Sequence, residues 1–135
     1  MILKNFLLLF FLYFGLSCSA QIDDINDTFH YAGRVELQEN NKVLLIASAS
    51  SVSFDFEGST CVINLQSVDT YEHHNFVSLE LDGEYIGRVL IKKGVAQKIP
   101  VTITNKNKKH RLTIYKATEA ANGAVLFIGT TAKLI

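Results

Sequence analysis

The feature that most constrains the fold is the alternation of apolar and polar residues along short segments. Val52, Phe54 and Phe56 are separated by Ser53 and Asp55, for example. Successive side chains of a β-strand point to opposite faces, so a period of two indicates half-buried strands. The pattern predicts strands at residues 29–38, 43–48, 51–57, 60–66, 75–82, 84–91, 97–103, 110–117 and 124–130.

Turn-forming residues separate these segments. Asp82-Gly83 lies between two apolar runs and is typical of a two-residue β-hairpin. Further breaks are Glu57-Gly58-Ser59, the polar run from Asn105 to Lys109, and Asn122-Gly123. Eight or nine short strands at this spacing predict an all-β fold, an antiparallel β-sandwich of jelly-roll type.

The first twenty residues have the pattern of a secretory signal peptide. Lys4 is followed by the apolar run Phe6 to Leu16, which is too short for a membrane-spanning helix. Small residues then precede Gln21, which predicts cleavage after Ala20; in the alternative, Cys18 is lipidated as in a bacterial lipoprotein. We therefore expect an exported protein that is secreted, periplasmic or a surface lipoprotein. Its only expected contact with a membrane is through a lipid on Cys18. The domains are a signal peptide (1–20), a short N-terminal segment (21–28) and the β-sandwich (29–135).

The charge of the chain argues against nucleic acid as a partner. After residue 20 the sequence holds 12 basic and 13 acidic side chains, whereas nucleic-acid-binding proteins usually carry a basic excess. Residues 21–91 contain 3 basic and 12 acidic residues, and residues 92–135 contain 9 basic and 1 acidic. Early and late strands lie side by side in a Greek-key sandwich, so we expect the opposite charges to meet across a sheet.

Few residues are candidates for catalysis. Cys61 alternates with Ile63 and Leu65, which predicts a buried core side chain rather than a reactive thiol. Ser59 follows a glycine in a turn, but it lacks the Gly-x-Ser-x-Gly elbow of serine hydrolases. We expect no cofactor.

The polar segment from Ser67 to Asn75 is predicted to be a loop, and it holds the candidate binding residues Tyr71, Glu72, His73 and His74. A metal site there would need the two histidines and an oxygen from Asp69 or Glu72, but adjacent residues on a strand point to opposite faces. We therefore expect no metal. A contact surface for a sugar, with Tyr71 stacking on it, is the alternative to a simple solvated loop. The other aromatic candidates, better explained by sheet packing, are Tyr31, Phe76, Tyr85 and Tyr115.

An ordered series of short motifs runs through the chain. It comprises Tyr31-Ala32-Gly33-Arg34, the Phe-x-Phe-x-Gly of Phe54 to Gly58, Asp82-Gly83, the Lys-x-Thr-Glu of Lys116 to Glu119, and Phe127-Ile128-Gly129. This series resembles the N-terminal jelly-roll domain of carbohydrate esterase family 2, whose members are secreted bacterial deacetylases of xylan and related plant polysaccharides. The resemblance carries over framework positions only: Gly33, Arg34, Phe54, Phe56, Gly58, Asp82, Gly83, Lys116, Thr118, Glu119 and Gly129.

The catalytic half of that family has no counterpart in the sequence. In the family an α/β domain of the SGNH hydrolase type follows the jelly roll and carries the nucleophile in a Gly-Asp-Ser motif, which this sequence lacks. The resemblance thus implies no catalytic residue, and we expect no enzyme activity from this chain alone. The expected function is that of an exported non-catalytic accessory domain, truncated or stand-alone, whose partner is a separate SGNH hydrolase domain or plant cell-wall polysaccharide. The alternatives are a stand-alone carbohydrate-binding module at the cell surface and an esterase of unrecognised chemistry with Ser59 as its only serine candidate.

Overall fold

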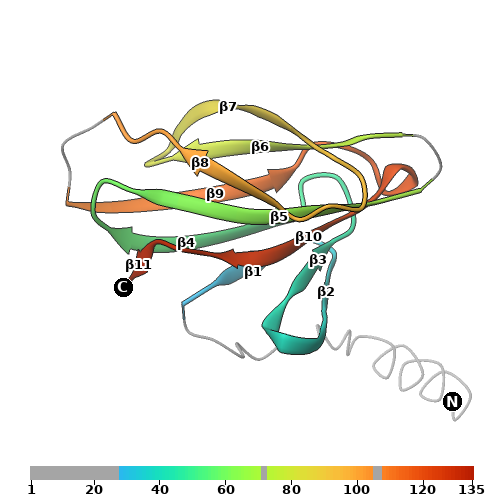
Figure 1. Ribbon diagram of the computed structural model, residues 1–135, viewed down its shortest axis with the longest axis horizontal. Coiled ribbons are helices and arrows are strands. Elements are labelled where there is room, and N and C mark those ends of the chain that lie inside the picture. The colour runs from blue at the N-terminus through green and yellow to red at the C-terminus, as the bar shows by residue number, and fades with distance from the viewer. Residues whose placement is uncertain (1–27, 71–72, 105–107) are drawn as a thin grey trace, which may run out of the picture.

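The computed structural model describes residues 28–70, 73–104 and 108–135, which form two antiparallel sheets packed face to face (Figure 1). Sheet A has the strand order β1-β4-β9-β6-β7, with β11 also paired to β4, and sheet B has the order β2-β3-β10-β5-β8. The only helices among the described residues are two short 3₁₀ turns, so the predicted all-β sandwich is confirmed. The elements are β1 (His30–Ala32), β2 (Val35–Leu37), η1 (Glu39–Asn41), β3 (Val43–Leu45), β4 (Ser51–Glu57), β5 (Cys61–Asp69), β6 (Asn75–Leu81), β7 (Glu84–Ile91), β8 (Gln97–Val101), β9 (Lys109–Lys116), η2 (Ala120–Asn122), β10 (Gly123–Thr130) and β11 (Lys133–Leu134).

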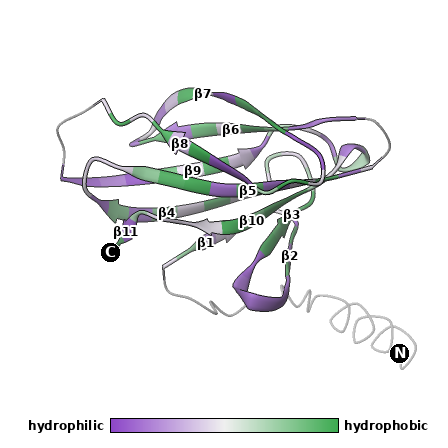
Figure 2. Cartoon of the chain, in the orientation of Figure 1, coloured by the Kyte–Doolittle hydropathy of each residue, from purple (hydrophilic) through white to green (hydrophobic). Residues whose placement is uncertain are grey.

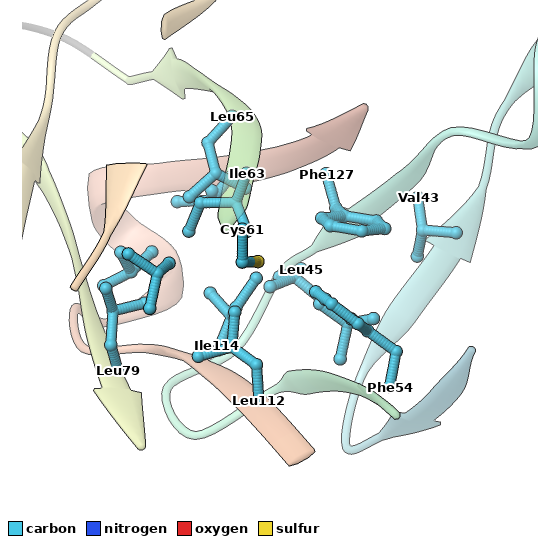
Figure 3. Packing of buried hydrophobic residues seen from close by; sticks show 14 of the residues in the cluster. Val43, Leu45, Phe54, Cys61, Ile63, Leu65, Leu79, Leu112, Ile114 and Phe127 are labelled. Atoms are coloured by element: carbon cyan, nitrogen blue, oxygen red, sulfur yellow. The ribbon is translucent and has the colours of Figure 1, made fainter. Parts of the chain in front are cut away.

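The core lies between the two sheets and is built from the apolar residues of the alternating pattern. Hydrophobic and hydrophilic residues alternate along the strands in Figure 2, and the apolar ones point inward, as the close view of the cluster shows (Figure 3). Phe54 and Phe127 come from opposite sheets, and the rings of both lie against Phe29, at centroid distances of 5.5 and 5.2 Å. Burying each such ring contributes about 1.5–3 kcal/mol, so this cluster joins the sheets.

The predicted single strand over 29–38 is wrong, because the chain changes sheet in the middle of it. β1 pairs with β4 in sheet A, and β2 pairs with β3 in sheet B. At the crossing, Gly33 has a φ of +80°, and a Cβ there would lie 3.0 Å from the Cα of Ser50. The buried Ser50 hydroxyl donates a hydrogen bond to the carbonyl of Arg34 at 2.9 Å, which ties the two crossing segments together.

The ends of other elements also differ from the prediction. β5 continues to Asp69, so the loop expected to start at Ser67 begins at Thr70. β11 was not predicted, and it pairs Lys133 and Leu134 with Glu57 and Phe56 of β4. No helix among the described residues is long and apolar enough to span a membrane.

The predicted Asp82-Gly83 hairpin is confirmed. The two residues connect β6 to β7 with φ values of +54° and +85°, the conformation of a type I′ turn. The Asp82 carboxylate lies 2.8 Å from Nδ1 of His110 through Oδ2, and its Oδ1 accepts the main-chain N–H of Arg111, also at 2.8 Å. The turn is thereby held against the start of β9.

Candidate binding surfaces

Lys116, at the end of β9, is a buried lysine that caps the following turn. Its side chain is almost fully buried, and Nζ donates to the carbonyl oxygens of Thr118 at 2.6 Å and Glu119 at 2.8 Å. Burial lowers the pKa of Lys116, and the charge of Glu119 partly opposes that shift. The Lys-x-Thr-Glu motif therefore has a structural explanation at this position.

Asn75, the first residue of β6, continues the same polar network. Its side-chain oxygen accepts the Thr118 hydroxyl at 2.6 Å, and its Nδ2 lies within 3.0 Å of Ser67 Oγ, Asp69 Oδ1 and the carbonyl of Asn122. Ser67 also donates to Asp69. The network joins the ends of β5, β6 and β9 to η2, and its polar groups are largely used by one another rather than presented to a ligand.

The predicted binding loop follows this network. Tyr71 and Glu72 lie outside the described residues, whereas His73 and His74 are exposed. Nδ1 of His74 is 3.9 Å from Oδ2 of Asp69, a fully buried side chain whose Oδ2 has no hydrogen-bond partner. In the described part of the chain, no three His, Cys, Asp or Glu side chains are grouped to hold a metal ion. Sugar contact by this loop stays a prediction.

Ser59 lies in a shallow hollow at the opposite end of the sandwich. The hollow is lined by Glu57, Gly58, Ser59, Lys108 and Lys133, so no histidine borders it. Lys133 binds Glu57 at 2.9 Å and lowers the pKa of that carboxyl. The lining thus offers Ser59 no imidazole base, which a serine nucleophile of the triad type requires.

Cys61 is a core residue, as its alternation predicts. It is buried, and its Sγ lies 3.6 Å from the hydroxyl oxygen of Thr130. Burial raises the pKa of the thiol, and the hydrogen bond with Thr130 only partly offsets that rise. A thiol with a raised pKa is protonated at neutral pH and is a weak nucleophile.

The remaining framework residues also have structural positions. Phe54 and Phe56 are fully buried, and Gly58 and Gly129 have φ values of +104° and +142°. Gly129 follows an irregularity in the pairing of β10 with β5. Arg34 contributes its main-chain carbonyl, which accepts the N–H of Ile46 at 3.0 Å.

The outer face of sheet A carries aromatic and hydrogen-bonding side chains that sequence reasoning did not group together. Opposite residues on paired strands share a face, and the register gives the row Tyr115, Ser78, Arg88 across β9, β6 and β7. The neighbouring row is Thr113, Glu80, Tyr85. Phe76 lies on the same face, with the Arg88 guanidinium carbon 4.4 Å from its ring centroid.

Tyr31, another aromatic candidate, instead packs against the core. For Phe76 and Tyr115, the sequence contains one indication of an outward position. Each stands where the alternation of its strand places a polar residue. The sequence alone did not show that β6 and β9 would be neighbours, which is what brings these rings onto one surface.

The outer face of sheet B has a different composition. Leu44 of β3 is opposite Leu126 of β10, and Ala124 of β10 is opposite Val68 of β5. Leu44 and Leu126 are half-buried, and Val68 is 46% exposed. The centre of this face is therefore aliphatic.

Comparison with known families and structures agrees with this architecture. Residues 31–134 match the family model described as carbohydrate esterase 2 N-terminal. A family two carbohydrate esterase from Clostridium thermocellum in complex with cellohexaose has a TM-score of 0.68 at 23% identity, covering 79% of this chain and 32% of that one. The acetyl xylan esterase Est2A from Butyrivibrio proteoclasticus has a TM-score of 0.68 at 20% identity, covering 82% and 30%. The chain thus spans about a third of the length of these esterases.

A smaller protein shares the fold over most of its own length. The carbohydrate-binding module CBM36 in complex with calcium and xylotriose has a TM-score of 0.59 at 15% identity, covering 76% of this chain and 90% of that one. At these identities the solved structures show the jelly-roll fold alone. No curated protein matches the chain.

Proposed function

Because the chain belongs to the carbohydrate esterase 2 N-terminal family, we propose that it is a non-catalytic accessory domain of an exported polysaccharide-deacetylating system. The esterases that share its fold are about three times as long. The partner in this proposal is an SGNH-type hydrolase domain that carries the nucleophile. The domain supplies a docking surface for that hydrolase.

The observation that carries the proposal is the aliphatic outer face of sheet B. Leu44, Leu126 and Ala124 are held by the sheet in one patch, with the exposed Val68 beside them. The solvent face of an antiparallel sheet is ordinarily polar, so a patch of this kind favours contact with another protein surface. Gln66, opposite Leu126, adds a hydrogen-bonding group at the side of the patch.

Co-expression with SGNH-type hydrolase domains of the source organism tests this role. We expect the chain to co-purify with one of them, and Leu126→Lys to abolish the association because it places a charge in the patch. Tyr85→Lys, at the exposed edge of sheet A, is the matched control and should leave association intact. The chain alone should release no acetate from an aryl acetate or acetylated xylan. Acetate release by the purified chain, with or without Ser59→Ala, would contradict the proposal.

A second function, a carbohydrate-binding module, is favoured by the outer face of sheet A. That face presents aromatic rings beside a carboxylate, a guanidinium and hydroxyl groups, the combination that recognises sugars. The shared fold with CBM36, described in complex with xylotriose, points the same way. Retention on insoluble xylan or cellulose is the expected result, and absence of retention on every plant glycan would count against it.

Either function requires export, which we attribute to residues 1–20. The two modes, cleavage after Ala20 and lipidation of Cys18, predict different mature proteins. Mass spectrometry of the protein from its own host should find either an N-terminal Gln21 or a lipid-modified Cys18. An intact Met1 in a cytoplasmic fraction would contradict export.

A further inference from the structure

We propose that the outer face of sheet A is an oligosaccharide-binding site centred on Tyr115, Glu80 and the Arg88–Phe76 pair, and that it takes an extended, uncharged polysaccharide chain. This inference rests on the glycan-binding function proposed above. It places the site on the sheet rather than on the predicted binding segment around Tyr71.

The rings provide the stacking surfaces. Tyr115 on β9 and Phe76 on β6 are half-buried, so their positions are set by the sheet, and Tyr85 on β7 is 67% exposed. With strands about 4.8 Å apart and alternate residues about 6.8 Å apart, the Cα atoms of Tyr115 and Tyr85 are separated by roughly 12 Å. That span suits several sugar rings in a row rather than a single monosaccharide. Aromatic faces pack against the C–H face of a sugar ring.

The polar groups between the rings supply hydrogen bonds. Glu80 lies between Thr113 and Tyr85, and within the described part of the chain its carboxylate has no hydrogen-bond or ion-pair partner. The guanidinium carbon of Arg88 lies 4.4 Å from the ring centroid of Phe76, a cation–π contact that positions the guanidinium without using its N–H donors. Ser78, between Tyr115 and Arg88, adds a hydroxyl.

The charge of the face selects the class of glycan. Among the described residues, Glu80 and Arg88 contribute one unpaired charge of each sign, and the two ion pairs formed by β4 on this face, Asp55–Arg111 and Glu57–Lys133, are each balanced. A binding site with one charge of each sign favours an uncharged sugar chain over a polyuronate or a sulfated glycan. Exposed apolar side chains on the edge strand β7, Ile86 and Leu90 among them, extend the surface beyond the hydrogen-bonding groups.

Titration of the full exported chain with xylohexaose and cellohexaose, read by calorimetry, tests the site. We expect one of them to bind, and Tyr115→Ala and Glu80→Gln each to weaken binding about tenfold or more, because a stacking surface or a charged hydrogen bond is lost. Arg88→Met replaces a surface side chain, so it should also weaken oligosaccharide binding while leaving the fold stable. Circular dichroism establishes that each variant is folded.

Two control variants separate the possible failures. Tyr71→Ala removes the predicted loop aromatic, and Leu126→Ser alters the outer face of sheet B; neither should change binding. If Tyr71→Ala alone abolishes binding, the glycan-binding function stands and the sheet A site is overturned. If the wild-type chain binds no hexaose and no insoluble glycan, the function and the site fail together.

Discussion

Asp55 on β4 lies directly opposite Arg111 on β9, and the two side chains form a paired hydrogen bond across the sheet. Nε and Nη2 of the guanidinium bind the two carboxylate oxygens at 2.6 and 2.8 Å. The residues come from the acidic first part and the basic last part of the chain. The expectation that these opposite charges meet across a sheet is confirmed here and at the Glu57–Lys133 pair.

The first prediction concerns acid stability. Arg111 lowers the pKa of Asp55, so the pair contributes its full stabilisation at pH values above about 3.8, the pKa of the carboxyl in the unfolded chain. This contribution is lost as the pH falls through the lower pKa of Asp55 in the folded protein. Asp55→Asn should cost no more than about 1 kcal/mol at pH 7, because both side chains are substantially exposed. Urea unfolding at pH 7 and pH 3, in a cycle with Arg111→Gln, measures this. An equal cost at both pH values would argue against the charge pairing.

The second prediction concerns Lys116. Lys116→Met keeps much of the volume but leaves the carbonyl oxygens of Thr118 and Glu119 without their donor, so we expect a loss of about 3 kcal/mol in the free energy of unfolding. Lys109→Met, an exposed lysine at the other end of β9, is the matched control and should change stability by less than about 0.5 kcal/mol. Equal unfolding midpoints for the two variants would mean that Lys116 does not hold the turn.

The third prediction concerns Gly123, where β10 starts close to the end of β5. A Cβ there would lie 2.0 Å from the carbonyl oxygen of Val68 and 2.7 Å from the amide nitrogen of Thr70. Gly123→Ala must therefore move backbone, and we expect it to cost about 3 kcal/mol or more. Gly83→Ala has a similar positive φ but no atom within 4 Å, and should cost only the backbone strain of about 1–2 kcal/mol. Thermal unfolding compares the two, and indistinguishable melting temperatures would contradict the close approach.

The fourth prediction concerns thiol reactivity. In a Cys18→Ser chain, Cys61 is the only thiol, and it is buried with a raised pKa. Its reaction with a disulfide reagent should be slow in the native protein and rapid in urea, with a rate that follows the unfolded fraction. Fast labelling of the folded chain at neutral pH would show that the thiol is accessible.

Much of the fold was predictable because burial repeats every second residue. Val52, Phe54 and Phe56 all point into the core as the alternation indicates, and the Asp82-Gly83 turn has the geometry that its two residues favour. The break at Gly33 was missed since a strand that leaves one sheet and enters the other keeps its alternation on both sides. Only the contact with Ser50, seventeen residues away, shows why a glycine stands there.

The candidate sites were less predictable, because they depend on which strands become neighbours. The Lys-x-Thr-Glu motif is local in the sequence, but the part played by Asn75 in holding it requires β6 to lie beside β9. Likewise, Tyr115 and Glu80 are far apart in the sequence and share a face only through that pairing. A local feature such as the Asp82-Gly83 turn could be identified from the sequence, whereas a surface assembled from three strands could not.

β1 and β11 pair with the same edge of β4, one after the other. β11 covers Phe56 and Glu57, the amide of Ile135 reaches the carbonyl of Asp55, and β1 continues from Ser53. Ile135 lies beside Asp55 of β4, and His30 lies beside Ser53, only two residues away along the same strand edge. The two ends of the folded domain are therefore close together. A short glycine-rich bridge from Ile135 to Thr28 should allow new ends to be opened at Asp82-Gly83, and we expect this circular permutant to retain the sandwich and its unfolding cooperativity.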